Sequence, residues 1–421
     1  MIVKTNGQES LIRVSLGVAH GCAFPTFALA TLVGMSRLGS IVLHGGVLST
    51  GIVLDRTRPD GWVAVVDGRI AALGDGPVPA TWDHVPHRDV GGRRIVPGFV
   101  DIHCHGGGGS TFGSVADEAL RALALHRSHG TTTTVASLVT APLDTLAASV
   151  ETLAELVQQG DLAGVHLEGP WLSPLHRGAH DPALLREPAL AEIDALLTAA
   201  GGVVRVVTIA PELAGGLEAV RRIVGHGAVA AIGHTDADER VALAAVDAGS
   251  RLTTHLFNAM PPVHHRRPGP VLALLEDERV VVELIADGAH LHPLTLAHAA
   301  RSAGPGRTAL VTDAMAAAGM PDGAYVLGDL AVDVTDGVAR LREGGAIAGS
   351  TLTLLAALRH ATLVAGVPFD DALTAATSVP AGVIGRTDVG RLEVGARGDV
   401  VVLGADLTVD AVYRGGELVG S

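Results

Sequence analysis

The middle of this 421-residue chain alternates apolar, strand-length segments with amphipathic, helix-length segments, and this pattern restricts the possible folds more than any other feature. Such alternation is typical of β-α-β units, in which parallel strands pair and helices cover the sheet. Eight segments have the composition of buried strands, namely residues 98–103, 131–139, 164–168, 203–209, 229–234, 252–255, 280–286 and 308–313. All but the last are clearly followed by helical sequence. Eight such units close a TIM-type (β/α)8 barrel, which we predict for residues 96–390.

The two ends of the chain share a different sequence pattern. Short β-like runs separated by turn residues fill residues 41–95, and similar runs return after Arg391 in GRLEVGARGDVVVLGADL. We expect residues 39–95 and 391–421 to build one small β-sandwich domain together. The barrel is then a single inserted domain.

The first residues of the chain resemble neither of these regions. The apolar run of residues 14–33 follows Lys4 and weakly resembles a signal peptide, but Gly21 and Pro25 interrupt it. We expect residues 1–38 to be a disordered or artefactual extension, with a membrane anchor as the alternative.

Charge and rare residues exclude several classes of protein. A formal net charge of -14 argues against nucleic acid or an anionic membrane as the main partner. Lys4 is the only lysine, which excludes a Schiff-base or carbamylated lysine in the body of the chain. The two cysteines, Cys22 and Cys104, provide no disulfide framework, and this fits the reducing cytoplasm.

A strand that ends in two histidines carries the first chemical signal. The segment IVPGFVDIHCHGGGG reads as a buried strand that runs into a glycine-rich loop. Side chains alternate faces along a strand, so His103 and His105 point the same way. Two neutral imidazoles one pleat apart can chelate a divalent ion. The alternative is a pair of solvated loop histidines.

Further metal-ligating residues stand at the ends of other predicted strands. In chain order the set is His103 and His105 after the first strand, Glu168 after the third, His234 after the fifth, His255 after the sixth and Asp313 after the eighth. The carboxyl ends of barrel strands meet on one face, where active sites are found. We therefore predict a centre for Zn²⁺ or another borderline divalent ion there.

This centre predicts hydrolysis. A bound cation lowers the pKa of water from about 15.7 to about 7, which yields a hydroxide nucleophile near neutral pH. Since no lysine is available, Glu168 is the candidate for a shared, bridging ligand. Asp313 is the candidate general acid/base, which takes a proton from that water and returns it to a leaving amine.

Residues in the following loops bear on the substrate. His180 lies in the loop after the third strand, where it can polarise a carbonyl or remain a surface histidine. Arg266 and Arg267 follow the sixth strand and His290 follows the seventh. Arginine and histidine can hold a phosphate, although an arginine pair in a polar loop is often simply solvated.

The motifs taken together resemble a known family. They are PGFVDIHCHGGGG, GVHLEGPWL, GAHDP, AIGHTDAD, THLFNAMPP, RRPG, ADGAH, VTDAM, AGSTLTL and GRLEVGARGDVVVL. From about residue 41 to its end, the chain resembles the N-acetylglucosamine-6-phosphate deacetylases of the amidohydrolase superfamily. The resemblance implies hydrolysis of N-acetyl-D-glucosamine 6-phosphate to D-glucosamine 6-phosphate and acetate, by a homodimer with one or two metal ions per subunit.

The resemblance also implies residue roles. Glu168, His234 and His255 would be the core metal ligands, Asp313 the catalytic acid/base, His180 the contact to the acetyl carbonyl, and Asn258, Ala259, Arg266 and His290 the contacts to the sugar phosphate. Some family members replace the histidines of the first strand and hold one metal. This chain keeps both His103 and His105, so the resemblance is compatible with either one or two ions per subunit.

Two other functions remain open at this point. One is another amidohydrolase, acting on a cyclic amide or an N-acyl substrate. The missing lysine weighs against the first, and the HLEGP and THLFNAMP runs weigh against the second. The other is a catalytically silent barrel that binds a sugar phosphate, although no predicted ligand is lost.

Overall fold

Eight parallel strands form a barrel in the computed structural model, which describes residues 39–420. The expectations for residues 1–38 lie outside the described residues. In order around the sheet, the barrel strands are β6 (Phe99–Cys104), β9 (Thr131–Val139), β10 (Gly164–Glu168), β11 (Val204–Ile209), β12 (Val229–Ile232), β13 (Leu252–Thr253), β14 (Val281–Ile285) and β15 (Thr308–Val311). Each strand corresponds to one of the eight predicted segments.

The first and last strands close the barrel just beyond the end of β15. The backbone N–H of Asp313 donates to the carbonyl of His103 at 2.8 Å, and the N–H of His105 donates to the carbonyl of Ala314 at 2.8 Å. The hydroxyl of Thr312 donates to the buried carboxylate of Asp101 at 2.6 Å. The predicted (β/α)8 barrel is therefore confirmed.

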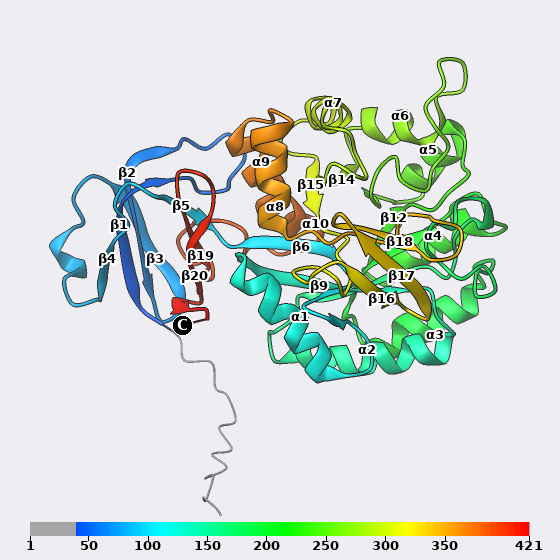
Figure 1. Cartoon of the computed structure of the whole chain (residues 1–421), viewed down its shortest axis with the longest axis horizontal. Helices are drawn as coiled ribbons and strands as arrows, with labels where there is room; N and C mark the ends of the chain where they lie inside the picture. The colour runs from blue at the N-terminus through cyan, green and yellow to red at the C-terminus, as the bar shows by residue number, and fades with distance from the viewer. Residues whose placement is uncertain (1–38, 421) are drawn as a thin grey trace, which may run out of the picture. The chain divides into compact units, whose positions relative to one another are not determined.

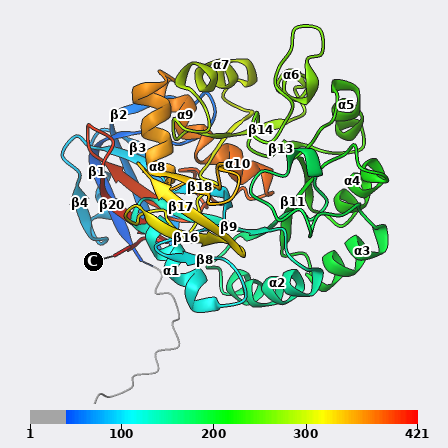
Figure 2. The same cartoon turned by 45° about the vertical axis from the view of Figure 1, so that its right-hand side comes forward.

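Helices follow the strands and surround them (Figure 2). They are α1 (Ala116–Ser128), α2 (Leu143–Gln158), α3 (Leu190–Ala199), α4 (Gly216–Gly225), α5 (Glu239–Asp247), α6 (Gly269–Glu276) and α7 (Pro293–Ala303). Leu146, Val150 and Leu153 recur at helical spacing and form the buried face of α2. Asp238 caps α5 by accepting from two backbone N–H groups of its first turn. Within residues 39–420, no helix is long and apolar enough to cross a membrane.

The segment after β15 begins with a small sheet instead of a helix. A three-stranded antiparallel meander comes first, and four short helical segments follow it. They are β16 (Gly323–Leu327), β17 (Leu330–Thr335), β18 (Val338–Leu341), α8 (Leu354–Arg359), the π-helical segment η3 (His360–Val364), α9 (Phe369–Ala375) and α10 (Ser378–Val383). The meander buries Leu327, Val332 and Val334 against Met315. It therefore packs beside the end of β15.

Both chain ends contribute to a separate eight-stranded sheet (Figure 1). Its strands are β1 (Ile41–Leu48), β2 (Arg58–Val66), β3 (Arg69–Asp75), β4 (His87–Asp89), β5 (Arg94–Pro97), β19 (Val400–Leu403), β20 (Val409–Arg414) and β21 (Glu417–Leu418). The two ends meet where β5 pairs antiparallel with β19, with Val96 opposite Val401. The expected joining of the chain ends is confirmed, and the expected sandwich takes the form of one hydrogen-bonded sheet.

Four shorter elements complete the described chain. They are β7 (Gly106–Gly107), β8 (Ser110–Thr111) and the 3-10 turns η1 (Ala80–Trp82) and η2 (Pro174–His176). The first two form a hairpin directly after His105, and η2 lies in the loop that follows β10. Both loops border the carboxyl ends of the barrel strands.

Candidate functional site

The barrel brings the six predicted metal ligands together at the carboxyl ends of its strands, and all six side chains are buried. Three of these residues have left-handed backbone conformations just after their strands end: His234 (φ +48°), His255 (φ +29°) and Asp313 (φ +49°). Non-glycine residues adopt this conformation at an energetic cost, and such residues cluster at functional sites. The chain therefore turns sharply at the positions where it presents these side chains.

Glu168, the last residue of β10, lies at the centre of the cluster. Its Oε1 atom is 3.2 Å from Nε2 of His234, 3.1 Å from Nε2 of His255 and 3.5 Å from Nε2 of His103. Its Oε2 atom is 3.1 Å from Nε2 of His105. One carboxylate thus reaches four imidazoles from the ends of three strands, β6, β12 and β13, which is the geometry expected of a shared ligand.

The remaining contacts divide the cluster into two halves. On one side, Nε2 of His234 and Nε2 of His255 are 3.0 Å apart. On the other, Nε2 of His103 and Nε2 of His105 are 3.2 Å apart, and Oδ1 of Asp313 lies 3.4 and 3.3 Å from them. The ligand atoms of His103, His105 and Asp313 lie close enough to share one cation, and those of Glu168, His180 and His234 form a second such group.

Hydrogen bonds to the outer ring nitrogens determine the histidine tautomers. His105 Nδ1 lies 3.1 Å from the carbonyl oxygen of Ser137, and His234 Nδ1 lies 2.9 Å from that of His176. A carbonyl only accepts, so both Nδ1 atoms carry the proton. The Nε2 lone pairs therefore face the centre, as metal coordination requires.

His180 has the opposite tautomer. Its Nδ1 atom accepts the backbone N–H of Thr140 at 3.4 Å, so its proton is on Nε2. That Nε2 atom lies 3.5 Å from Oε2 of Glu168. With this tautomer, His180 presents a hydrogen-bond donor to the centre, and the same ring also lies within reach of Glu168 and His234.

The electrostatics of the cluster favour a cation. Burial lowers the pKa of His105, but its bonds to Asp313 and Glu168 prevail and raise that pKa to about 9. Burial raises the pKa of Glu168, but the nearby His103 holds it well below its usual range. No arginine among residues 39–420 forms an ion pair with these carboxylates. The cluster therefore combines imidazoles with two carboxylates that have no arginine partner in the described part of the chain. Such a donor set fits a bound divalent metal.

A cavity of about 270 Å³ opens onto the cluster. Among the residues predicted to bind substrate, His180, Asn258, Ala259 and His290 line it. The ring of His290 is held by Asp287, whose carboxylate lies 2.6 Å from Nδ1 of His290. The structure thus brings these four residues to the same cavity as Glu168 and Asp313.

Arg266 is the predicted substrate residue that does not line this cavity. It lies exposed in the loop before α6, and its guanidinium contacts the neighbouring His265 at 2.7 Å. The structure of a single chain therefore does not bring Arg266 to this cavity.

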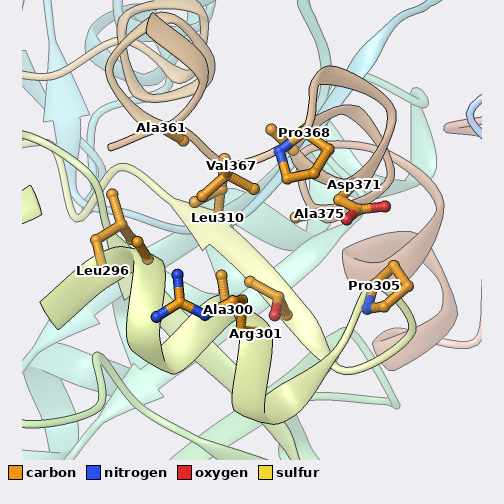
Figure 3. Close-up of a pocket in the computed structure, with 14 residues that line it drawn as sticks. Leu296, Ala300, Arg301, Pro305, Leu310, Ala361, Val367, Pro368, Asp371 and Ala375 are labelled. Atoms are coloured by element: carbon orange, nitrogen blue, oxygen red, sulfur yellow. The ribbon is translucent and has the colours of Figure 1, made fainter. Parts of the chain in front are cut away.

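A second cavity, of about 240 Å³, lies away from the cluster between α7, η3 and α9 (Figure 3). Its lining is mainly aliphatic, with Leu296, Leu310 and Val367 among the residues shown, and Arg301 and Asp371 supply its charged groups. It contains none of the predicted metal ligands.

Sequence reasoning missed two buried polar residues beside the centre. Glu283 on β14 has Oε2 3.0 Å from Nδ1 of His103. The ring of His166 on β10 packs edge-on against that of His103, with centroids 4.6 Å apart. A charged residue within the otherwise apolar strand VVELI is the signal that could have revealed Glu283.

Comparisons with known proteins identify similar chains. Residues 94–419 match the amidohydrolase family. The N-acetylgalactosamine-6-phosphate deacetylase of Escherichia coli O157:H7 is 38% identical over 370 residues, which cover 85% of this chain and 96% of that protein. The human N-acetylglucosamine-6-phosphate deacetylase is 37% identical over 350 residues, which cover 79% of this chain and 85% of that protein.

A solved structure is similar over nearly the whole described chain. It is a mutant N-acetyl-D-glucosamine-6-phosphate deacetylase from Mycobacterium smegmatis in complex with N-acetyl-D-glucosamine-6-phosphate. It is 47% identical, covers 91% of this chain and 100% of its own, and has a TM-score of 0.86.

Proposed function

The chain belongs to the amidohydrolase family, and we propose that it hydrolyses N-acetyl-D-glucosamine 6-phosphate to D-glucosamine 6-phosphate and acetate. The observation that carries this proposal is the convergence of five histidines and Asp313 on Glu168 at a cavity of about 270 Å³. The similarity to deacetylases of amino-sugar phosphates supports the choice of substrate.

We assign the metal ligands from the two halves of the cluster. His234 and His255 would hold one divalent ion, while His103, His105 and Asp313 would hold a second, with Glu168 shared between them. Imidazole and carboxylate ligands favour zinc. A divalent ion supplies Lewis acidity toward water and toward a carbonyl oxygen.

The other catalytic steps fall to side chains. Nε2–H of His180 donates to the acetyl carbonyl oxygen and stabilises the negative charge that develops there. The carboxylate of Asp313 takes a proton from the attacking water and delivers it to the amine nitrogen as the C–N bond breaks. Asn258, Ala259 and His290 contact the sugar phosphate from the cavity wall.

The role of His180 predicts a defect in catalysis without loss of metal. We expect His180→Asn to lower kcat by about 10²–10³-fold, since one donor to the developing oxyanion is removed. Metal content per chain, measured by elemental analysis, should stay unchanged because Nε2 of His180 carries a proton. Leu175→Ala, an exposed position in the same loop, is the control with normal kcat. Loss of an ion from His180→Asn would instead make His180 a ligand.

We propose a homodimer as the active form. No arginine lines the described part of the cavity, while the loop that carries Arg266 is exposed. The corresponding loop of a second subunit would supply the cationic group that a phosphate needs. We place the enzyme in the cytoplasm, since two cysteines provide no disulfide framework.

Acetate release from zinc-loaded and chelator-treated protein tests the proposed function. We expect metal-dependent release from N-acetylglucosamine 6-phosphate and none from unphosphorylated N-acetylglucosamine. Light scattering on the same preparation measures the oligomeric state. N-acetylgalactosamine 6-phosphate is assayed in parallel, because the similar Escherichia coli protein bears that name. Faster release from this epimer would change the assigned sugar, and metal-bound protein that releases acetate from neither would contradict the deacetylase proposal.

A further inference from the structure

Glu283 is a buried carboxylate for which the proposed reaction has no direct use. It is fully buried on β14, whose other side chains are all apolar. Its Oε2 atom accepts two hydrogen bonds, one from Nδ1 of His103 at 3.0 Å and one from the backbone N–H of His255 at 3.1 Å. One oxygen atom therefore connects the two halves of the metal cluster.

The first bond controls the imidazole of His103. With its proton on Nδ1 and donated to Glu283, His103 keeps a lone pair on Nε2. That Nε2 atom lies 3.4 Å from Asp313 and 3.5 Å from Glu168. The Nδ1 atoms of His105 and His234 bond backbone carbonyls, which are uncharged. Among these three histidines, only His103 has a carboxylate as its Nδ1 partner. A carboxylate partner increases the basicity of a ligating imidazole.

The second bond controls the backbone of His255. His255 adopts a left-handed conformation with φ +29°, and its own Nδ1 atom is buried without a hydrogen-bond partner. The ring is therefore oriented through its backbone, which Glu283 holds by the N–H group. The carbonyl of Glu283 also accepts the N–H of Leu256 at 2.9 Å, so the following residue is held as well.

The negative charge of Glu283 favours the binding of a second cation in the cluster. Together with Glu168 and Asp313 it places three carboxylates in one buried cluster, and no arginine among residues 39–420 pairs with any of them. One divalent ion would balance two of these three negative charges. A second ion would balance the remaining carboxylate. Oε1 of Glu283 is also buried without a hydrogen-bond partner. A buried charge so poorly compensated is costly in the absence of nearby cations.

We propose that Glu283 is a positioning residue for the ion at His103, His105 and Asp313, acting through the imidazole of His103. This inference rests on the proposed function, because it assumes a metal-dependent hydrolase centre. The rival explanation is purely structural: Glu283 braces the loop at His255 and has no effect on the second ion.

Metal binding by Glu283→Gln and Glu283→Leu distinguishes these explanations. Glu283→Gln keeps an oxygen that can accept the N–H of His255, so it should hold the ion at His234 and His255 with normal affinity. Both variants should bind the second ion about 10–100-fold more weakly, as for other residues that orient metal ligands. The loss should be larger for Leu, which has no acceptor, than for the isosteric Gln. Affinities are measured by competition with a chelator, ions per chain by elemental analysis, and the coordination of each site by Co²⁺ absorption.

A double substitution tests whether Glu283 acts through His103. His103→Ala should weaken the second ion on its own, and adding Glu283→Gln should weaken it no further. Asp399→Asn is the control, since Asp399 is equally buried but bonds Arg397 and Gly415, in the loops next to β19 and β20 of the other sheet. Both ions should keep normal affinity in this control.

Three results would overturn the inference: normal affinity for the second ion in both Glu283 variants, an additive loss in the double variant, or an equal loss of both ions. If Glu283→Leu fails to fold, Glu283→Gln and its double variant still decide the question. Wild-type protein that binds two ions yet releases no acetate would contradict the proposed function, whereas the metal affinities would still measure the role of Glu283.

Discussion

Asp313→Asn should lower kcat for acetate release by about 10⁴-fold, the upper end of the range for one general acid–base group, because the same carboxylate serves the water and the departing amine. Asn has nearly the same shape and keeps an oxygen toward His103 and His105, but it cannot accept and return a proton. The variant should therefore still bind the sugar phosphate and the ion at His234 and His255. Single-turnover acetate release and elemental analysis of the same sample measure the two properties.

The backbone around Asp313 makes this substitution informative. The Asp313 N–H donates to His103, and its carbonyl accepts the N–H of Ser350 at 2.7 Å. Gly349 allows this approach, because a Cβ atom there would lie 2.8 Å from the Asp313 carbonyl oxygen. The backbone should therefore hold Asn in the same place. Asp333→Asn, an exposed change in the neighbouring meander, is the control with normal kcat; an Asp313→Asn enzyme within about tenfold of normal would exclude the assigned role.

The barrel could be predicted because each buried strand is a separate apolar segment, and such segments are visible without knowledge of their partners. The positions at which β12 and β13 end could not be predicted in this way. The sequence pattern extends them to His234 and His255, but the structure ends them two residues earlier, at Ile232 and Thr253. Both histidines adopt left-handed conformations, which end the hydrogen-bonded pairing of the strands. This local conformation directs the two side chains to the site at the expense of strand length.

The site was predictable to the extent that its residues share one rule, namely their position at the end of a strand. Glu283 does not follow that rule, since it lies within β14 and reaches the centre from inside the barrel. Arg266 illustrates the opposite limit. The resemblance to a known family implies that it contacts the sugar phosphate, but the loop places it on the surface of its own chain. Sequence position reports neither side-chain direction within a barrel nor the path of a loop.

Glu168→Gln should have a still larger effect, because it removes the one carboxylate that reaches both halves of the cluster. The amide loses the negative charge, and its NH₂ group is a poor metal ligand that would face Nε2 of either His255 or His105. We expect the protein to lose both ions and its activity to fall to that of chelator-treated wild type, a greater loss than for Asp313→Asn.

Two measurements separate this expectation from simple unfolding. Elemental analysis reports ions per chain, and circular dichroism reports whether the barrel is intact in the variant. Glu212→Gln is the matched control: its carboxylate bonds the hydroxyl of Thr235 at 2.5 Å and the N–H of Asp236, and forms no ion pair with the histidines of the cluster. It should keep both ions. A folded Glu168→Gln protein that retains two ions would show that the two halves bind metal independently, and Glu168 would then not be a shared ligand.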